Sequence, residues 1–216
     1  MQLSIPLPVR VATGREDFMV STSNAAAATA VDGWRDWPQA RLALIGPEGS
    51  GKSHLVRIWA AEAGAAVLPA AKLRAEDAPS LAGGPLCVED ADRGVDEEAL
   101  FHLWNATAQA GLPLLLTGRR PPSEWNVALP DLASRLASLV PVTIEAPDDA
   151  LLSMILVKLF ADRQLSVRPA LIGWLLRRIE RSHAAAIATV ERLDREALAQ
   201  GVALDLALAR SVLGPD

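Results

Sequence analysis

The feature that most constrains this chain is the segment Gly46-Pro47-Glu48-Gly49-Ser50-Gly51-Lys52-Ser53, with the spacing G-x-x-x-x-G-K-S. The apolar run 42–45 before it predicts a buried strand, and residues 54–61 after it predict a helix. A strand, a glycine-rich loop and a helix form the context in which this spacing binds phosphates. The glycines let backbone N–H groups turn toward an anion, and the start of the helix presents further N–H groups to it. We therefore predict a nucleotide site, with Lys52 contacting the terminal phosphates and Ser53 serving as a ligand of Mg²⁺.

A second candidate site follows the apolar run 86–88, where Glu89 and Asp90 stand at the expected carboxyl end of a buried strand. Nucleotide-binding folds place a Mg²⁺ partner and a water-orienting base at this edge of the sheet. The next buried run, 112–116, ends in the polar residue Thr117. Solvated acids after a strand are also common, but the phosphate-binding motif upstream favours a catalytic reading of Glu89 and Asp90.

The rest of the chain alternates strand and helix patterns and then becomes entirely helical. Strands are predicted at 42–45, 65–68, 86–90, 112–118 and 142–144, and helices at 20–34, 96–110 and 132–136, while 70–82 is ambiguous. Alternation of this kind predicts a mainly parallel sheet with right-handed crossovers. Four further helices are predicted at 148–163, 168–181, 183–200 and 204–213, with Pro169 in a first turn and Gly201 at a C-cap.

These patterns predict an α/β fold made of a three-layer α/β/α core and a small helical domain. We assign residues 14–147 to the α/β domain and residues 148–216 to an all-helical lid that can close over a nucleotide. Residues 1–13 are predicted to be extended because Pro6 and Pro8 forbid a helix there. The apolar side chains of this tail can pack on their own domain or dock on a partner, and the residues alone leave both options open.

Composition excludes several classes of protein. The net charge of −5 over 216 residues argues against a broad basic face for strong direct DNA binding. Cys87 is the only cysteine, so no disulfide can form within the chain and a reducing, cytoplasmic location is expected. No apolar run approaches the length of a membrane span, and the N-terminus lacks the apolar core of a signal peptide.

Several segments in this order resemble the AAA+ ATPases, and among them the DnaA-related proteins. The phosphate loop continues as Lys52-Ser53-His54-Leu55, similar to the G-K-T/S-H-L of that family, and Phe18-Met19-Val20 with Ser23-Asn24 resembles its segment before the nucleotide site. Residues 117–122 resemble its sensor-1 segment, and residues 132–136 resemble its arginine-finger segment. The tail Gln2-Leu3-Ser4-Ile5-Pro6-Leu7 is nearly identical to the sliding-clamp-binding motif of the Hda-type members, and no DNA-binding helix-turn-helix follows the expected lid. The alanine- and arginine-rich lid is similar to those of the α-proteobacterial branch.

This resemblance implies a regulator of DNA replication initiation that binds the sliding clamp and stimulates ATP hydrolysis by DnaA. It implies ADP or ATP with Mg²⁺ as cofactors, and it allows a homodimer. The implied nucleotide contacts are Gly46, Pro47, Glu48, Gly49, Ser50, Gly51, Lys52, Ser53, His54 and Thr117. The implied metal ligands are Ser53 and Glu89, the implied catalytic residues are Arg135, Asp90 and Glu89, and the clamp contacts are residues 2–7. Arg135 matches the arginine finger, which acts on the ATP of a neighbouring molecule.

Three positions depart from the family pattern. Glu89-Asp90 replaces the usual pair of aspartates, Arg119 stands where the sensor-1 segment commonly carries an acid, and Ala184 stands at the sensor-2 arginine. These departures predict at most weak intrinsic ATPase activity. One alternative is a small phosphate-loop kinase or another free-standing P-loop NTPase, which gives no reason for the clamp-like tail. The other is an accessory protein that contacts DNA itself, which the net charge disfavours.

Overall fold

A five-stranded sheet forms the centre of the computed structural model, which describes residues 14–15 and 18–214. The strands β1 (Arg41–Ile45), β2 (Ala66–Pro69), β3 (Leu86–Glu89), β4 (Leu114–Gly118) and β5 (Pro141–Thr143) lie in the order β2-β3-β4-β1-β5. Every pairing between them is parallel, which confirms the predicted α/β fold with a parallel sheet. The carboxyl ends of β1, β3 and β4 therefore lie at one edge of the sheet, where the phosphate loop and the acidic pair begin.

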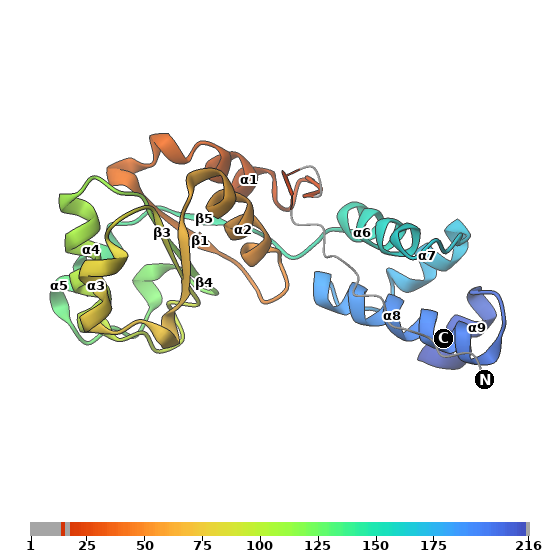
Figure 1. Cartoon of the computed structure of the whole chain (residues 1–216). Coiled ribbons are helices and arrows are strands. Elements are labelled where there is room, and N and C mark those ends of the chain that lie inside the picture. The colour runs from red at the N-terminus through yellow and green to blue at the C-terminus, as the bar shows by residue number, and fades with distance from the viewer. Residues whose placement is uncertain (1–13, 16–17, 215–216) are drawn as a thin grey trace.

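Helices cover both faces of the sheet and make the predicted three layers (Figure 1). The helices α1 (Ala25–Asp32) and α2 (Lys52–Ala63) pack on one face, and α3 (Ala78–Leu81), α4 (Glu97–Gln109) and α5 (Pro130–Ala137) pack on the other. Successive side chains of a strand point to opposite faces. Cys87 accordingly packs with α1 and α2, whereas its neighbours Leu86 and Val88 pack with α3, α4 and α5.

The sequence of α4 explains its position. Leu100, Leu103 and Trp104, which share one face of the predicted helix, are all buried against the sheet. At the start of the helix the Asp96 side chain accepts a hydrogen bond of 3.0 Å from the backbone N–H of Ala99. This cap satisfies one of the unpaired N–H groups of the first turn.

The first helix is shorter than the predicted range 20–34 because the Asn24 side chain forms hydrogen bonds within the turn before it. Its Oδ1 accepts a hydrogen bond from the backbone N–H of Ser21, and its Nδ2 donates one to the carbonyl oxygen of Met19. The helix begins at Ala25, and the Asn24 side chain does not cap it. Residues 18–24 therefore form an irregular segment that leads from the phosphate-loop side of the core into α1.

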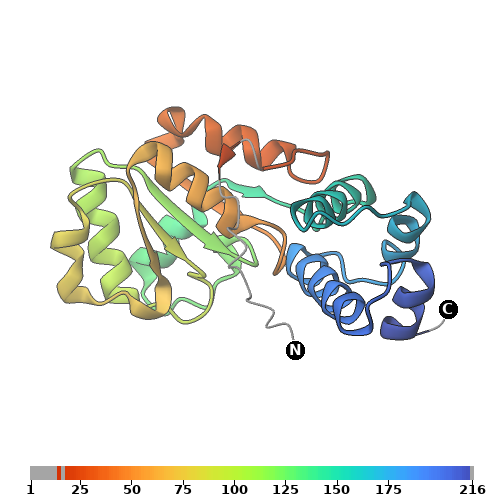
Figure 2. The same cartoon turned by 45° about the vertical axis from the view of Figure 1, so that its right-hand side comes forward.

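The C-terminal helices enclose an apolar cluster of their own. They are α6 (Asp149–Asp162), α7 (Pro169–Leu175), α8 (His183–Gln200) and α9 (Leu206–Leu213). Leu152, Leu156, Phe160 and Leu193 are fully buried in this cluster. Figures 1 and 2 show these helices beside the α/β core, joined to it by the segment 144–148. α7 ends at Leu175, earlier than the predicted 181, because the chain turns there toward the start of α8.

Side-chain contacts anchor the connection between the core and α6. The Thr22 hydroxyl donates a hydrogen bond of 2.9 Å to the Asp148 carboxylate. The same carboxylate accepts a hydrogen bond of 2.7 Å from the backbone N–H of Leu151 and so caps α6. The bond from Leu151 is the main cause of the lowered pKa of Asp148. The backbone N–H of Glu145 also donates to the carbonyl oxygen of Ser23. The start of α6 is therefore tied to the segment before α1.

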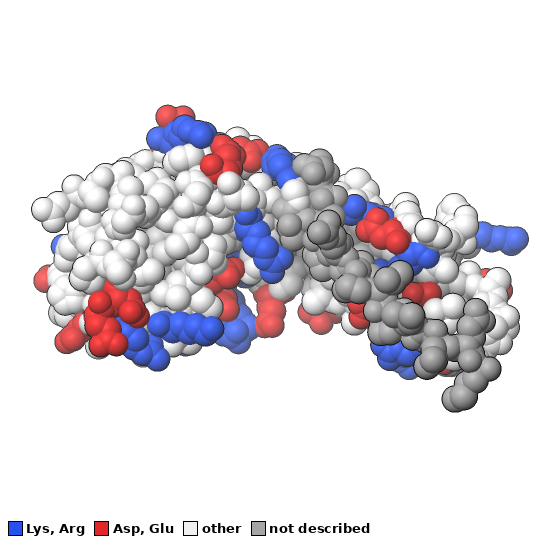
Figure 3. Space-filling model, viewed as in Figure 1, with Lys and Arg blue, Asp and Glu red and all other residues white. Residues whose placement is uncertain are grey.

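Charged side chains of both signs lie close together on one face of the molecule (Figure 3). On the face in Figure 3, the described acidic and basic residues lie in small adjacent groups, in keeping with the net charge of −5. Among the described residues, no helix combines the length and the apolar character that a membrane span requires.

Candidate functional site

The glycine-rich segment 46–51 connects the end of β1 to the start of α2, as the sequence predicts. At two positions of this loop a side chain would clash, in each case with a different neighbouring segment. A Cβ on Gly46 would lie 2.1 Å from the carbonyl oxygen of Ile144, and one on Gly49, whose φ is +74°, would lie 2.5 Å from Cβ of Ser182. The loop is thus wedged between the segment after β5 and the start of α8, with its backbone in conformations that only glycine adopts freely.

Lys52, the first residue of α2, is 8% exposed, and its amine lies within the loop. Its Nζ donates hydrogen bonds of 2.7 Å to the carbonyl oxygen of Gly46 and 2.8 Å to that of Pro47. Burial lowers the pKa of Lys52, and the carboxylates of Asp90 and Asp92 partly oppose this effect. A buried amine whose partners are neutral carbonyl groups can exchange them for the oxygens of a phosphate.

Ser50 gives independent support for an anion site. Its side chain is 4% exposed, and its hydroxyl has no hydrogen-bond partner among the residues that the structure describes. Buried polar groups in proteins are nearly always hydrogen-bonded, so an unsatisfied hydroxyl in a glycine-rich loop at a helix start suits a ligand that accepts hydrogen bonds.

The ends of β3 and β4 are held together by Thr117, which is 1% exposed. The backbone N–H of Asp90 donates a hydrogen bond of 3.0 Å to its hydroxyl, and the backbone N–H of Ala91 donates one of 2.8 Å to its carbonyl oxygen. This arrangement keeps Asp90 at a φ of +56°. A cavity, described below, lies at the carboxyl edge of the sheet. Asp90 lines it, whereas Glu89 and Thr117 do not. The predicted roles of Glu89 and Thr117 toward a nucleotide therefore stay predictions.

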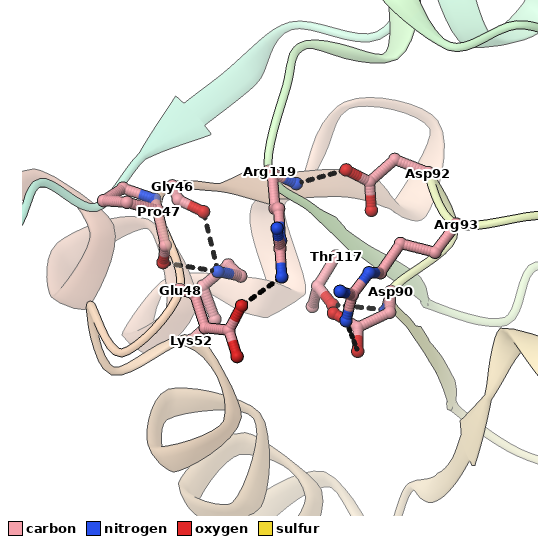
Figure 4. A network of polar contacts seen from close by, with 9 residues as sticks. All are labelled: Gly46, Pro47, Glu48, Lys52, Asp90, Asp92, Arg93, Thr117 and Arg119. Carbon is pink, nitrogen blue, oxygen red and sulfur yellow. Dashed lines mark hydrogen bonds and ion pairs between the residues drawn. The ribbon is translucent and has the colours of Figure 1, made fainter. Parts of the chain in front are cut away.

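Two residues that the sequence prediction did not assign to the site lie beside the loop (Figure 4). The backbone N–H of Arg119 donates a hydrogen bond of 2.8 Å to Asp92, and its guanidinium forms an ion pair with Glu48 of the loop. A basic residue directly after a buried strand gives Arg119 some signal in the sequence. Asp92 has no signal beyond its place shortly after Asp90, because its contact depends on how β3 and β4 pair.

A cavity of about 800 Å³ extends from the loop to the C-terminal helices. Its phosphate-loop end is polar, and its other walls include the apolar side chains Phe18, Met19, Leu151, Ile155 and Ile187. His54 and Ser53, which the sequence assigns to the nucleotide, also line it. The volume lies within the range typical of small-molecule sites, and the combination of a polar end with apolar walls suits a ligand that is anionic at one end.

The start of α8 closes one side of this cavity. The backbone N–H of His183 donates a hydrogen bond to the carbonyl oxygen of Gly49, and Ala184 also lines the cavity. The rings of His183 and His54 lie 6.5 Å apart, and Phe18 meets His54 edge-on at 5.3 Å. Burial lowers the pKa of His183, so this ring is neutral at neutral pH.

Arg135 lies on α5 and does not line the cavity. Its guanidinium donates a hydrogen bond to Oδ1 of Asn105 and lies 4.6 Å from the centre of the Phe101 ring. Both partners come from α4, so the side chain is held against the helices that cover the face of the sheet opposite α2.

Two further predictions concern a metal ion and the contacts with the sliding clamp. Among the described residues, no group of three or more His, Cys, Asp or Glu side chains is arranged to hold a metal ion. Mg²⁺ in nucleotide sites takes few ligands from the protein, because phosphates and water supply the others. The predicted clamp contacts, residues 2–7, lie outside the described residues.

No protein-family model matches the chain, but solved structures do. Domain III of the replication initiation protein DnaA from Thermotoga maritima has a TM-score of 0.80 at 17% identity, covering 96% of this chain and 98% of that domain. A DnaA bound to AMPPCP and single-stranded DNA has a TM-score of 0.71 at 18% identity, covering 83% of this chain. A variant of RuvB from Thermotoga maritima has a TM-score of 0.72 at 14% identity, covering 93% of this chain and 71% of that one.

These comparisons establish the fold, which is similar to that of domain III of DnaA and to that of RuvB. The chain spans 63% of the length of the DnaA that is bound to AMPPCP and single-stranded DNA, while it spans nearly all of the isolated domain III. The predicted α/β fold with its parallel sheet is therefore confirmed.

Proposed function

We propose that this chain is a nucleotide-binding regulator of DNA replication initiation, of the Hda type. It binds ADP or ATP at residues 46–54, and the C-terminal helices act as the lid of this site. The observation that carries the proposal is the buried Lys52 amine, which lies inside a glycine-rich loop at the mouth of an 800 Å³ cavity. The unsatisfied Ser50 hydroxyl and the positive end of α2 fit the same anionic ligand.

The apolar walls of the cavity support a nucleotide over a simple phosphate ion. Phe18 and Met19 come from the segment before α1, and Leu151, Ile155 and Ile187 come from α6 and α8. A base can be enclosed between these two groups while the phosphates reach Lys52. Adenine is proposed because one of the DnaA structures similar to this chain is bound to AMPPCP.

Mg²⁺ fits the donors at the polar end. Ser53 is exposed at the start of α2, and Asp90 supplies a carboxylate from the turn after β3, with Glu89 as the last residue of that strand. When bound, the cation would neutralise phosphate charge. The protein's own contribution is to orient the phosphates through Lys52 and the loop N–H groups.

The regulatory part of the proposal concerns two partners. Residues 2–7 dock on the DNA polymerase sliding clamp, and Arg135 acts as an arginine finger on ATP bound by DnaA. The position of Arg135 supports action on a second molecule, since it lies outside the cavity and is held by Phe101 and Asn105. An arginine supplied by a partner stabilises the negative charge that develops during phosphoryl transfer.

Calorimetry with ADP and ATP tests the nucleotide site. Lys52→Ala is expected to weaken binding by about tenfold to a hundredfold, since a charge-assisted hydrogen bond contributes about 1.5–3 kcal/mol. Lys72→Ala serves as the matched control, because Lys72 is exposed and does not line the cavity. Equal affinity of the wild type and Lys52→Ala contradicts the proposed site.

A hydrolysis assay tests the regulatory activity and separates it from a kinase. The wild-type protein is added to ATP-bound DnaA with and without the clamp loaded on DNA. We expect DnaA to hydrolyse ATP faster only when both the protein and the clamp are present. Turnover near the enzyme median of about 10 s⁻¹ by this protein alone would instead indicate a free-standing enzyme.

A further inference from the structure

The cavity has a second polar end, between α6 and α8 and away from the phosphate loop. α8 begins beside Gly49 of the loop and runs away from the α/β core (Figures 1 and 2). Ile155 of α6 and Ile187 of α8 line the stretch between the two ends. The side chains at the second end are charged and are Lys158, Asp162, Arg163 and Glu191.

The residue spacing along α8 gives the separation of the two ends. His183, Ile187 and Glu191 follow one another at intervals of one helical turn, so they share a face of α8, and all three line the cavity. An α-helix rises about 1.5 Å per residue, which places Glu191 about 12 Å beyond His183. This separation is comparable with that between the terminal phosphate and the base of an extended nucleoside diphosphate. A ligand whose phosphates lie at Lys52 therefore brings its base toward Glu191.

The Glu191 carboxylate is held by an arginine and still has acceptor capacity. The Arg163 guanidinium donates a hydrogen bond of 3.3 Å to Oε1 of Glu191 and another of 3.2 Å to the carbonyl oxygen of Leu159. The Arg163 side chain is only 9% exposed, whereas that of Glu191 is 49% exposed. A carboxylate offers about four acceptor positions, so Glu191 can accept from a ligand while its bond to Arg163 remains.

The acid on the opposite wall is placed differently. Asp162 lies 3.8 Å from the amine of Lys158, one turn earlier on α6, so its charge is paired within that helix. An ionised carboxylate accepts hydrogen bonds but cannot donate them, so Glu191 selects a ligand group that donates. Adenine carries such a group, its exocyclic amine, on the ring that lies away from the ribose.

We propose that Glu191 determines base specificity by accepting a hydrogen bond from the exocyclic amino group of the base. This inference rests on the proposed nucleotide site. Arg163 acts as a positioning residue, because it holds the carboxylate from the buried side. A base without the amino group leaves the carboxylate without a donor after water has been displaced, and this loss costs affinity.

The test compares ADP with the 5′-diphosphate of purine riboside, which differs from ADP only in lacking the amino group. Calorimetry gives the ratio of the purine riboside Kd to the ADP Kd, which is expected to be about tenfold or more for the wild type, the size of a hydrogen bond to a charged group. Glu191→Ala is expected to weaken ADP binding and to bring this ratio to about one. Glu191→Gln keeps an oxygen that accepts a weaker, neutral hydrogen bond, so its ratio should lie between the two.

Two controls remove other acids. Asp162→Ala changes the opposite wall of the cavity, and Glu180→Ala changes an exposed residue that does not line it, so neither is expected to alter the ratio. A wild-type ratio near one, or the wild-type ratio retained in Glu191→Ala, overturns the inference while the nucleotide site stands. An equal fall of the ratio in Asp162→Ala also overturns it, because this end of the cavity would then act through its total charge. If the wild type binds neither diphosphate, the proposed nucleotide site fails and the inference fails with it.

Discussion

The backbone N–H of His183 donates a hydrogen bond of 3.1 Å to the carbonyl oxygen of Gly49. This bond joins the first residue of α8 to the middle of the glycine-rich loop, so the C-terminal helices contact the place where we propose that phosphates bind. The Ser182 side chain packs against Gly49 at the same point. Changes in the loop are therefore expected to alter the position of these helices, and the reverse.

Gly49→Ala is expected to weaken nucleotide binding by more than tenfold. The new Cβ would lie 2.5 Å from Cβ of Ser182, and a φ of +74° costs an alanine about 1–2 kcal/mol. The control is Gly64→Ala at the end of α2, where φ is +65° and no atom lies within 4 Å of the new Cβ. Both variants should lose unfolding free energy in urea, but only Gly49→Ala should lose affinity in calorimetry. Equal affinities of the two variants would show that the contact between Gly49 and Ser182 is unimportant for binding.

His183 is expected to make folding stability dependent on pH. Burial lowers its pKa in the folded protein below the ordinary value of 6.5, so the unfolded chain binds more protons between those two values. The free energy of unfolding should therefore be highest above about pH 6.5 and should fall as the pH drops toward the folded pKa.

His183→Gln tests this dependence, because glutamine keeps a polar side chain and has no titration in this range. Urea unfolding at pH 7.5 and pH 5.5 should show a smaller loss of stability in the variant than in the wild type. The comparison between proteins separates the contribution of His183 from that of all other groups that titrate. An unchanged pH dependence in His183→Gln would assign the effect to other groups.

Arg135→Ala is expected to abolish the stimulation of ATP hydrolysis by DnaA while leaving nucleotide binding by this protein intact. The guanidinium does not line the cavity, and arginine fingers contribute about 10³–10⁵ in rate in known cases. Arg195→Ala, at an exposed position of α8, serves as the control for the loss of a positive charge. Normal stimulation by Arg135→Ala would remove the finger from the proposal.

Deletion of residues 1–8 is expected to abolish binding to the sliding clamp without unfolding the protein. Leu3, Ile5 and Leu7 can fill an apolar pocket, and Pro6 reduces the entropy that an extended peptide loses on docking. The free peptide of these residues should bind the clamp with a Kd on the order of micromolar, about −8 kcal/mol. Calorimetry against the clamp measures both, and thermal unfolding checks the fold. A deletion that unfolds the protein, or that binds the clamp as before, would favour a structural role for the tail.

The sequence by itself was sufficient to predict the strands and most helices of the core. Apolar runs bounded by turns predicted the strands, because buried parallel strands need continuous apolar side chains, and the helical pattern of Leu100, Leu103 and Trp104 predicted the buried face of α4. The spacing from Gly46 to Ser53 predicted a loop between a strand and a helix, because a glycine-rich turn of this kind depends on local backbone geometry. It did not predict that α1 begins only at Ala25, since Asn24 bonds to its own turn.

Only the tertiary structure decided how the ends of distant elements meet. Asp92 accepts a hydrogen bond from the backbone N–H of Arg119 because β3 and β4 are neighbours in the sheet. Glu48 forms an ion pair with Arg119 because β1 lies on the other side of β4. His183 reaches Gly49 because the chain turns between α7 and α8. Strand order and helix packing set these contacts, and they depend on which apolar surfaces the whole chain can bury together. Local spacing therefore identifies the phosphate loop, whereas the charges and the C-terminal helices that surround it follow from the fold.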